Sequence, residues 1–280
     1  MIIKYILNAI CNASSKWDDE YDQQDIFYSA NIFIPASKKA LLPLYENDYP
    51  RNPNNKIVES LNKSPFFLFN DNLKSKIDHS DGVLFCQKQY TVTHCNNDKP
   101  SKKENNDTAA AEKLNAPMAC FPYVINKNDK HNPNFFGAVR SFVNKEIEYI
   151  SNSREVLGDF LTQLSEENTY DRYLSKSFIE RVRAYYKDDE GKSILSIPLI
   201  NYEINSPIAV KPSTEVHAVV NLYRNKNGML LTKERAESFC ELIRPLCCHL
   251  SLVLAFNKAI ESTNNLGAHN RNNNAAQETP

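Results

Sequence analysis

The order and patterning of the hydrophobic residues predict an α+β domain built on a mainly antiparallel sheet. The chain opens with a helical pattern, shows strand-like alternation in two separate regions with helical periodicity between them, and closes on another helix. Repeated strand–helix units, which a doubly wound parallel sheet would require, are not evident. A central antiparallel sheet with helices packed on it therefore accounts best for the pattern.

The N-terminus is predicted to form an amphipathic helix over Ile2 to Ile10. Its hydrophobic residues recur every three or four positions: Ile2, Ile3, Ile6, Leu7 and Ile10. Lys4 and Asn8 interrupt this run, which is far shorter than the roughly 20 residues that a membrane span needs. We therefore expect neither a signal peptide nor a membrane anchor in this segment.

The first strand region lies between residues 26 and 126. Alternation in 26–45 predicts a strand, a turn at "PASKK" and a returning strand that ends near Tyr45. The segments 65–70 and 81–95 are interpreted as further strands, and strand-like patterning resumes over 116–126 and 134–152. Residues 46–117 are expected to be an insertion, and its polar part from Asn96 to Glu112 a mobile surface excursion.

The second half is predicted to contain helices, a strand pair and a closing helix. Helical periodicity covers Arg154 to Tyr186, and the segments 192–204 and 215–225 are expected to pair as antiparallel strands. The last helix is predicted to begin at Thr232, a good N-cap. Residues 1–262 are thus interpreted as one elaborated domain and 263–280 as a disordered polar tail.

Composition excludes several classes of function. The 33 basic and 34 acidic residues leave a net charge of −1, which argues against nucleic acid as a partner. Seven cysteines without a CxxC pair predict reduced thiols and a cytoplasmic location, with no metal site. Phosphate-binding, zinc-protease, serine-hydrolase and calcium motifs do not occur, so we expect a protein without a cofactor that is more a binding protein than an enzyme.

Four segments carry a recognisable pattern: "SILSIPLI" followed by "EVHAVVNLYRNKNGMLLTKERAESFCELI", the upstream "FFGAVRSFVNKEIEYISN", and "YSANIFIPASKKALLPLY" near the start. Together they resemble the GAF domain, a small-molecule sensor module related to PAS domains. The chain departs from the family at Ala218, where many members have glycine, at Pro245 inside the last helix, and in the long insertion 46–117.

The resemblance implies a ligand cup on one sheet face, under residues 137–186, and both terminal helices on the other face. A planar ligand such as a nucleotide base would stack on aromatic side chains there. His217 is expected to share a strand face with Val219, Asn221 and Tyr223, and this face is a candidate lining for the cup. The expected ligand-binding residues are Phe142, Tyr149, Tyr173, Phe178, Arg140 and His217.

The last helix is hydrophobic on more than one face, so more than one face must be covered. The resemblance implies that the terminal helices pair in a homodimer and signal to an unidentified effector protein. The expected interface residues are Ile3, Ile6, Ile10, Leu246, Leu250 and Val253. A helix buried wholly within its own domain would explain the same residues.

Two other functions remain open from the sequence. Cys86, Cys95 and Cys120 suggest a thiol reductase, because some GAF-like enzymes reduce free methionine sulfoxide with three cysteines; such chemistry needs a thiolate and a resolving thiol. This chain has "GVLFCQ" where those enzymes have a Gly-Val-Cys-Gly neighbourhood. The other alternative is a dimeric scaffold whose cup is filled by side chains.

Overall fold

The computed structural model describes residues 2–18, 25–43, 55–95, 118–126, 130–188, 191–206 and 209–275, with the backbone alone for 201–214 and 261–275. The described strands form one antiparallel sheet in the order β4-β2-β1-β7-β6-β5, and β3 pairs with β1 next to β2. Their bounds are β1 Phe27–Ser37, β2 Gly82–Cys86, β3 Val92–Cys95, β4 Cys120–Tyr123, β5 Glu148–Ile150, β6 Ser193–Ser206 and β7 Ala209–Arg224. Together with the helices, this sheet confirms the predicted α+β class.

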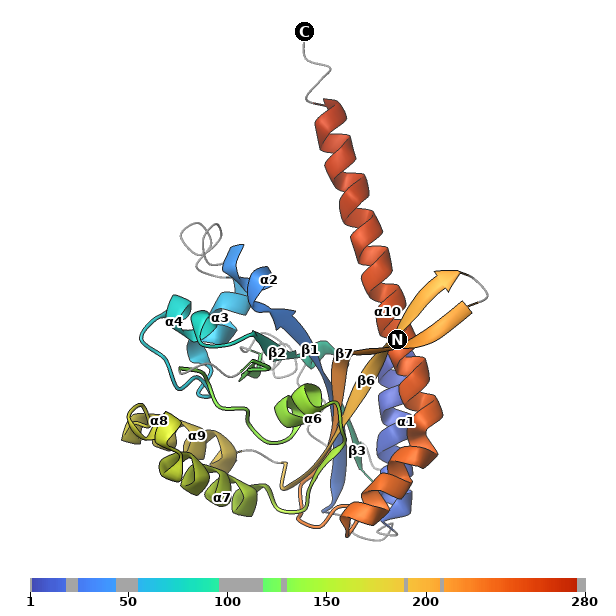
Figure 1. Ribbon diagram of the computed structural model, residues 1–280. Coiled ribbons are helices and arrows are strands. Elements are labelled where there is room, and N and C mark those ends of the chain that lie inside the picture. The colour runs from blue at the N-terminus through green and yellow to red at the C-terminus, as the bar shows by residue number, and fades with distance from the viewer. Residues whose placement is uncertain are drawn as a thin grey trace.

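The helices cover both faces of this sheet (Figure 1). The terminal helices α1 and α10 lie on one face, and α6, α7 and α9 lie on the other. The bounds are α1 Ile2–Trp17, α2 Lys38–Pro43, α3 Lys56–Lys63, α4 Leu73–Asp78, α6 Ala138–Asn144, α7 Ser153–Glu166, α8 Asn168–Asp171, α9 Lys176–Asp188 and α10 Lys233–Ala275; a 3-10 turn, η2, spans Lys88–Tyr90.

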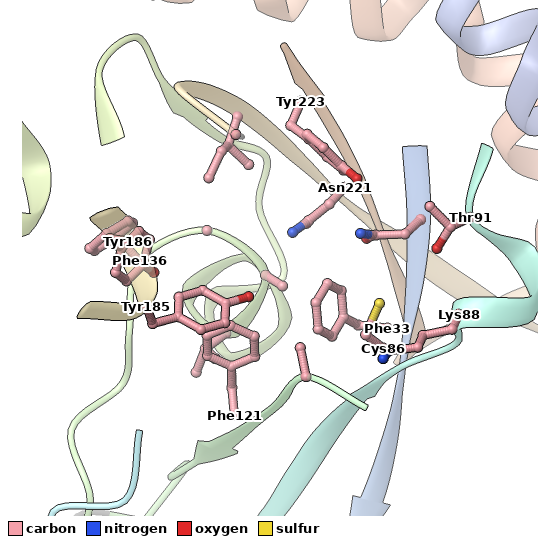
Figure 2. A pocket seen from close by; sticks show the side chains of 17 residues that line it. Phe33, Cys86, Lys88, Thr91, Phe121, Phe136, Tyr185, Tyr186, Asn221 and Tyr223 are labelled. Carbon is pink, nitrogen blue, oxygen red and sulfur yellow. The ribbon is translucent and has the colours of Figure 1, made fainter. Parts of the chain in front are cut away.

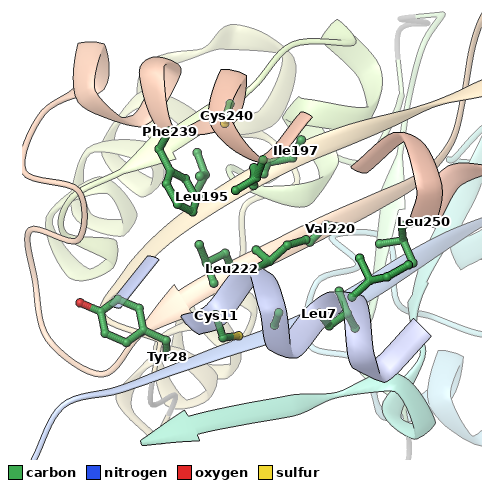
Figure 3. Packing of buried hydrophobic residues seen from close by; sticks show 14 of the residues in the cluster. Leu7, Cys11, Tyr28, Leu195, Ile197, Val220, Leu222, Phe239, Cys240 and Leu250 are labelled. Atoms are coloured by element: carbon green, nitrogen blue, oxygen red, sulfur yellow. The ribbon is translucent and has the colours of Figure 1, made fainter. Parts of the chain in front are cut away.

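The core under the terminal helices joins α1, α10 and the middle of the sheet (Figure 3). Leu7 from α1, Leu222 from β7 and Phe239 from α10 are each fully buried in it. The two helices run antiparallel, because the Trp17 ring at the end of α1 lies 5.9 Å from the Phe239 ring near the start of α10, whereas Leu7 shares the cluster with Leu250. The predicted N-terminal helix is confirmed and extends to Trp17.

The core on the opposite face is dominated by aromatic rings. Phe66 stacks on Phe121 with ring centroids 4.0 Å apart, and Phe135 meets Phe66 edge-on at 5.0 Å. Phe178 of α9 is fully buried in the same cluster. The helices expected over 154–186 are confirmed, and their hydrophobic stripes cover this aromatic core.

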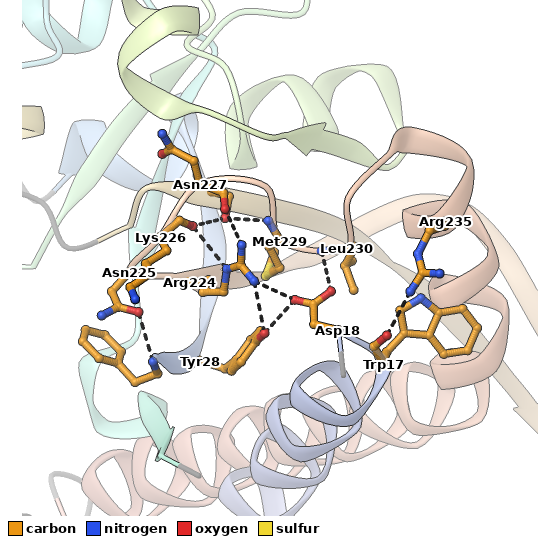
Figure 4. Close-up of polar contacts among 12 residues, drawn as sticks. Trp17, Asp18, Tyr28, Arg224, Asn225, Lys226, Asn227, Met229, Leu230 and Arg235 are labelled. Carbon is orange, nitrogen blue, oxygen red and sulfur yellow. Dashed lines mark hydrogen bonds and ion pairs between the residues drawn. The ribbon is translucent and has the colours of Figure 1, made fainter. Parts of the chain in front are cut away.

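A buried ion pair fixes the turn between β7 and α10 to the end of α1 (Figure 4). The Asp18 carboxylate accepts hydrogen bonds from the Tyr28 hydroxyl at 2.6 Å and from the Leu230 amide at 2.7 Å, and it lies 3.2 Å from the Arg224 guanidinium. The side chains of Asp18 and Arg224 are 2% and 5% exposed. Leu230 and Leu231 have φ values of 60° and 62°, a strained conformation for leucine that these contacts hold in place.

Three sequence predictions in the first half are wrong. The returning strand after "PASKK" is the helix α2, because the partner of this end of β1 is β2, which arrives from later in the chain. The segment 65–70 is not a strand but a series of turns and bends, in which Phe66 and Phe67 are buried in two different clusters. The segment expected to be a strand at "FFGAVRSF" forms α6 instead, after Gly137 with φ of 79°.

The expected insertion 46–117 contributes directly to the sheet. It supplies β2, which pairs with both β1 and β4, and β3, which pairs with the start of β1. The helices α3 and α4 from the same stretch bury Val58, Leu61 and Ile77 against β2. The excursion expected over 96–112 lies outside the described residues.

The last helix begins as predicted and continues farther than predicted. The Thr232 hydroxyl accepts a hydrogen bond from the Arg235 amide, which confirms the N-cap. The helix then passes through Pro245 and runs to Ala275, over most of the stretch expected to be a disordered tail. Residues 276–280 lie outside the described part of the chain.

One stretch of α10, Lys233–Ile260, is long and hydrophobic enough to cross a membrane. Within this stretch, Phe239, Ile243 and Leu250 are buried in the core that α10 shares with the sheet. Leu242 and Phe256, in contrast, are 56% and 53% exposed. Figure 1 shows the later turns of α10 extending away from the sheet.

Candidate functional site

A cavity of about 440 Å³ lies between the sheet and the helices α6 and α9 (Figure 2). Strands β1, β2, β4, β6 and β7 form its floor, and the start of α6 and the end of α9 form its roof. A volume of this size falls in the range of about 300–1,000 Å³ that is usual for small-molecule sites. It lies on the sheet face opposite α1 and α10.

Aromatic rings form most of the wall of this cavity. The Phe33 and Phe121 rings meet edge-on at 5.6 Å, and the Phe121 ring lies 6.4 Å from that of Tyr185. Tyr223 of β7 lies at the far side of the cavity from Phe121 (Figure 2). Rings in this arrangement offer flat hydrophobic surfaces on which a planar ligand can stack.

The sheet side of the cavity carries a pair of carboxamides. Asn31 of β1 and Asn221 of β7 are direct partners in the strand register, so their side chains lie on the same face. The Asn221 Oδ1 accepts a hydrogen bond of 2.8 Å from the Ser196 hydroxyl. The Asn31 Oδ1 is buried and has no hydrogen-bond partner among the described residues.

The described residues of the cavity wall include a positively charged side chain and no acidic one. Lys88 supplies an ammonium group, and Thr91 beside it supplies a hydroxyl. Burial lowers the pKa of Lys88, and the neighbouring Cys86 opposes that change. Aspartate and glutamate are absent from the described lining residues. Neutral or anionic ligands are therefore better suited to this cavity than cations.

The three cysteines considered for redox chemistry do not come together. In the register of β2 and β4, Cys120 is opposite Phe85, so it points to the other sheet face from Cys86. Cys95 pairs with Phe27, six residues along β1 from the Phe33 that pairs with Cys86, which is about 20 Å. Burial raises the pKa of both Cys86 and Cys120 to about 12. Disulfide exchange among these thiols is not supported.

None of the six residues expected to bind ligand lines this cavity. Phe178 is fully buried core, the Phe142 ring packs 4.8 Å from that of Tyr123, and the Tyr173 ring lies 5.1 Å from that of Phe69. The Tyr149 hydroxyl donates a hydrogen bond of 2.6 Å to the Met229 carbonyl on the terminal-helix side. Arg140 lies over the Phe160 ring, 5.5 Å from its centroid.

His217 faces α10 instead of the cavity. An irregularity in the pairing of β6 with β7 aligns Leu199 with Ala218 and Ile200 with Val216, which leaves His217 without a partner in the register. The alternation of side chains between the two sheet faces, which runs from Ala218 onward, therefore does not extend to His217. Its Nε2 lies 3.0 Å from the Ser251 hydroxyl of α10. Burial, and secondarily Lys258, lowers the pKa of His217 to about 4. The prediction that it shares a face with Val219 is wrong because of this bulge.

Asn221 and Tyr223 line the cavity, as expected of their strand face, whereas Asn31, Phe33, Lys88 and Phe121 were not among the expected lining residues. A partial signal was present, because Asn31 and Phe33 alternate in β1 as Asn221 and Tyr223 do in β7. The register that pairs Asn31 with Asn221 depends on the fold. Individual strand patterns do not contain it.

Glu148 gives the stability a dependence on pH. Burial raises the pKa of its carboxyl to about 7, against the opposing effects of Arg140 at 3.8 Å and the Gly137 amide. Between pH 4.5 and pH 7 the folded state keeps a proton that the unfolded chain has released. Stability from this group is therefore greatest at low pH and falls as the pH rises through this window.

We expect Glu148→Gln to remove this loss, because glutamine accepts the same Gly137 hydrogen bond without a charge. The difference in stability between the variant and the wild type should grow by about 2 kcal/mol, in favour of the variant, as the pH rises from 5 to 8. This figure is reduced because the Glu148 side chain is 21% exposed. Urea unfolding at both pH values measures the change. An equal difference between the two proteins at pH 5 and pH 8 would contradict it.

Among the described residues, no cluster of three or more histidine, cysteine or acidic side chains is placed to hold a metal ion. Comparisons with protein-family models, with curated proteins and with solved structures find no match to this chain. The geometry of the cavity and of the helices therefore carries the functional argument.

Proposed function

We propose that this protein is a non-catalytic sensory or regulatory domain that binds a small molecule in the cavity between the sheet and α6 and α9. The buried Asn31 Oδ1 at the edge of an aromatic-walled cavity carries the proposal. A buried acceptor without a partner costs about 1–3 kcal/mol, and a bound ligand that donates to it removes this cost.

The arrangement of the helices agrees with a GAF-like sensor. The terminal helices lie on one sheet face and the cavity on the other, as the resemblance in the sequence implies. Strand β7 connects the two faces, since Asn221 and Tyr223 line the cavity while Val220 and Leu222 pack beneath the terminal helices. Ligand binding would favour one position of β7 over others, and this change would alter how α10 packs on the sheet.

The other two functions have less support. A reductase needs thiols within exchange distance, and the strand register separates Cys86, Cys95 and Cys120. A scaffold with a filled cup would leave no cavity of about 440 Å³ on this face. We keep the cytoplasmic location as part of the proposal, because none of the seven cysteines forms a disulfide.

The proposed homodimer uses a different surface from the one expected. Of the expected interface residues, Ile3, Ile6, Ile10 and Leu250 are buried within their own chain, while Leu246 and Val253 are partly buried against the same core. Exposed hydrophobic side chains include Ile2 and Tyr5 near the start of α1 and Phe256 and Ile260 in the later turns of α10. The antiparallel packing of α1 on α10 brings these two ends together, so we place the contact between subunits, and with an effector protein, there.

The proposal is tested by thermal unfolding with a panel of nucleotides, amino acids and aromatic metabolites. A ligand that binds only the folded state raises stability by RT ln(1 + [L]/Kd), so one compound class should raise the Tm by several degrees. Ala119 lines the cavity, and Ala119→Phe should abolish that shift by filling the cavity. A shift that persists in Ala119→Phe, or an unchanged Tm across the panel, would count against the cavity as the binding site.

A further inference from the structure

We propose that the cavity selects a planar heteroaromatic ligand by a lactam edge, a ring C=O beside a ring N–H, which Asn31 and Asn221 bind together. The inference rests on the proposed function and adds the chemical class of the ligand. Neither residue belongs to the ligand-binding set expected from the sequence. The structure brings them together through the pairing of β1 with β7.

The two carboxamides form one recognition surface because of their register. Asn31 and Asn221 are directly opposite on adjacent antiparallel strands, which places their Cβ atoms about 4.5–5.5 Å apart on the same face. That spacing suits two adjacent polar atoms on the edge of one ring. In Figure 2 the Asn221 amide nitrogen points into the cavity, toward the space between Tyr223 and Phe33.

Hydrogen bonding within the protein assigns a role to each carboxamide. The Asn221 Oδ1 is occupied by the Ser196 hydroxyl at 2.8 Å, which holds the side chain so that its Nδ2 is the group left to donate. Asn31 supplies the acceptor, since its Oδ1 is buried without a partner among the described residues. Rotation about the Cβ–Cγ bond, a soft torsion in asparagine, lets this oxygen meet a ligand donor.

A lactam matches this donor and acceptor together. Its carbonyl accepts from Asn221 and its adjacent N–H donates to Asn31, which gives a bidentate contact of the kind that asparagine makes with nucleobase edges. An ester or an N-alkylated lactam retains the acceptor but leaves the Asn31 Oδ1 unpaired. A site with a buried polar group that stays unpaired rejects such an analogue strongly.

The rest of the wall restricts the ligand further. The rings of Phe33, Phe121 and Tyr223 border the same space and favour a flat aromatic system over an aliphatic one. Lys88 is in the wall and acidic residues are absent from the described lining, so the ligand is neutral or carries an anionic substituent. The same positive charge disfavours cationic heterocycles.

The test uses three bicyclic probes of the same shape with the full chain: quinazolin-4(3H)-one, its N3-methyl derivative and quinazoline. Dissociation constants are measured by titration calorimetry or ligand-observed NMR. We expect quinazolin-4(3H)-one to bind at least tenfold more tightly than the N3-methyl derivative and quinazoline. We expect Asn31→Leu and Asn221→Leu, which keep the branched shape and the number of heavy atoms in the side chain, to reduce this ratio to near one.

Asn70→Leu is the matched control, since Asn70 is an exposed asparagine outside the cavity lining; it should keep the wild-type ratio. Equal affinity for all three probes would overturn the lactam inference while leaving the cavity as a binding site for rings. Binding of none of them at millimolar concentration would also overturn it, and the broad thermal panel then decides the proposed function separately. The probe series on the wild-type protein answers the question even if a leucine variant fails to fold.

Discussion

Replacing Asp18 with alanine should lower the free energy of unfolding by about 3–5 kcal/mol, the usual cost of removing one partner of a buried ion pair. The Arg224 guanidinium would remain 5% exposed without its carboxylate, and the Tyr28 hydroxyl and Leu230 amide would lose their acceptor. The strained backbone of Leu230 and Leu231 would also lose the contact that holds it. Urea unfolding followed by far-UV circular dichroism measures the loss without depending on the nearby Trp17.

Two further variants separate the buried charge from general damage. The double variant Asp18→Leu, Arg224→Met replaces both charges with hydrophobic side chains and should recover much of the lost stability, because no buried ion is left unpaired. Glu59→Ala removes an exposed ion pair with Lys63 at 2.8 Å and should cost under about 1 kcal/mol. If Asp18→Ala cost no more than Glu59→Ala, the ion pair would not hold the β7–α10 turn.

Elements with a strong internal period could be predicted from the sequence. The stripe from Ile3 to Ile10 predicts α1, and the alternation in 192–204 and 215–225 predicts the paired strands β6 and β7. These segments are fixed by local burial, since one face of each is hydrophobic over many residues. The position of both terminal helices on one side of the sheet was expected from the resemblance to the GAF domain, and the shared core of α1 and α10 agrees with it.

Elements decided by distant partners could not be predicted. A returning strand was expected after "PASKK", yet Lys38–Pro43 form α2, because β2, which begins at Gly82, occupies the end of β1. A single bulge turns the His217 side chain away from the cavity face on which it was expected, and no alternation pattern in the sequence contains that bulge. The Asn31–Asn221 pair likewise exists only through the register of β1 with β7, so neither strand pattern by itself indicates that the two residues act together.

Strand β7 is the element through which binding and output would be coupled. Its cavity face carries Asn221 and Tyr223, and its other face packs through Val220 and Leu222 beneath α1 and α10. Arg224 at its end is fixed by Asp18, so the strand is anchored where the chain turns into α10. A ligand that bridges β1 and β7 therefore acts on the same strand that supports the last helix.

Phe239→Ala should destabilise the whole domain by about 3–5 kcal/mol, the usual cost of deleting a buried aromatic ring. Phe239 of α10 is fully buried and lies beside Leu195 (Figure 3). Its ring is 5.9 Å from that of Trp17. Leu242→Ala, one turn away and 56% exposed, is the matched control and should cost under about 1 kcal/mol. Far-UV circular dichroism in urea reports the sheet and the helices together.

The same pair of variants decides whether the early part of α10 belongs to the domain core or to a membrane. The stretch Lys233–Ile260 is long and hydrophobic enough to span a bilayer, yet a spanning helix would not contribute to the stability of the sheet. A cooperative loss of several kcal/mol in Phe239→Ala, with Leu242→Ala near wild type, requires α10 to be packed on β6 and β7 in solution. Unchanged stability in both variants would separate α10 from the domain and remove the route by which β7 is proposed to signal.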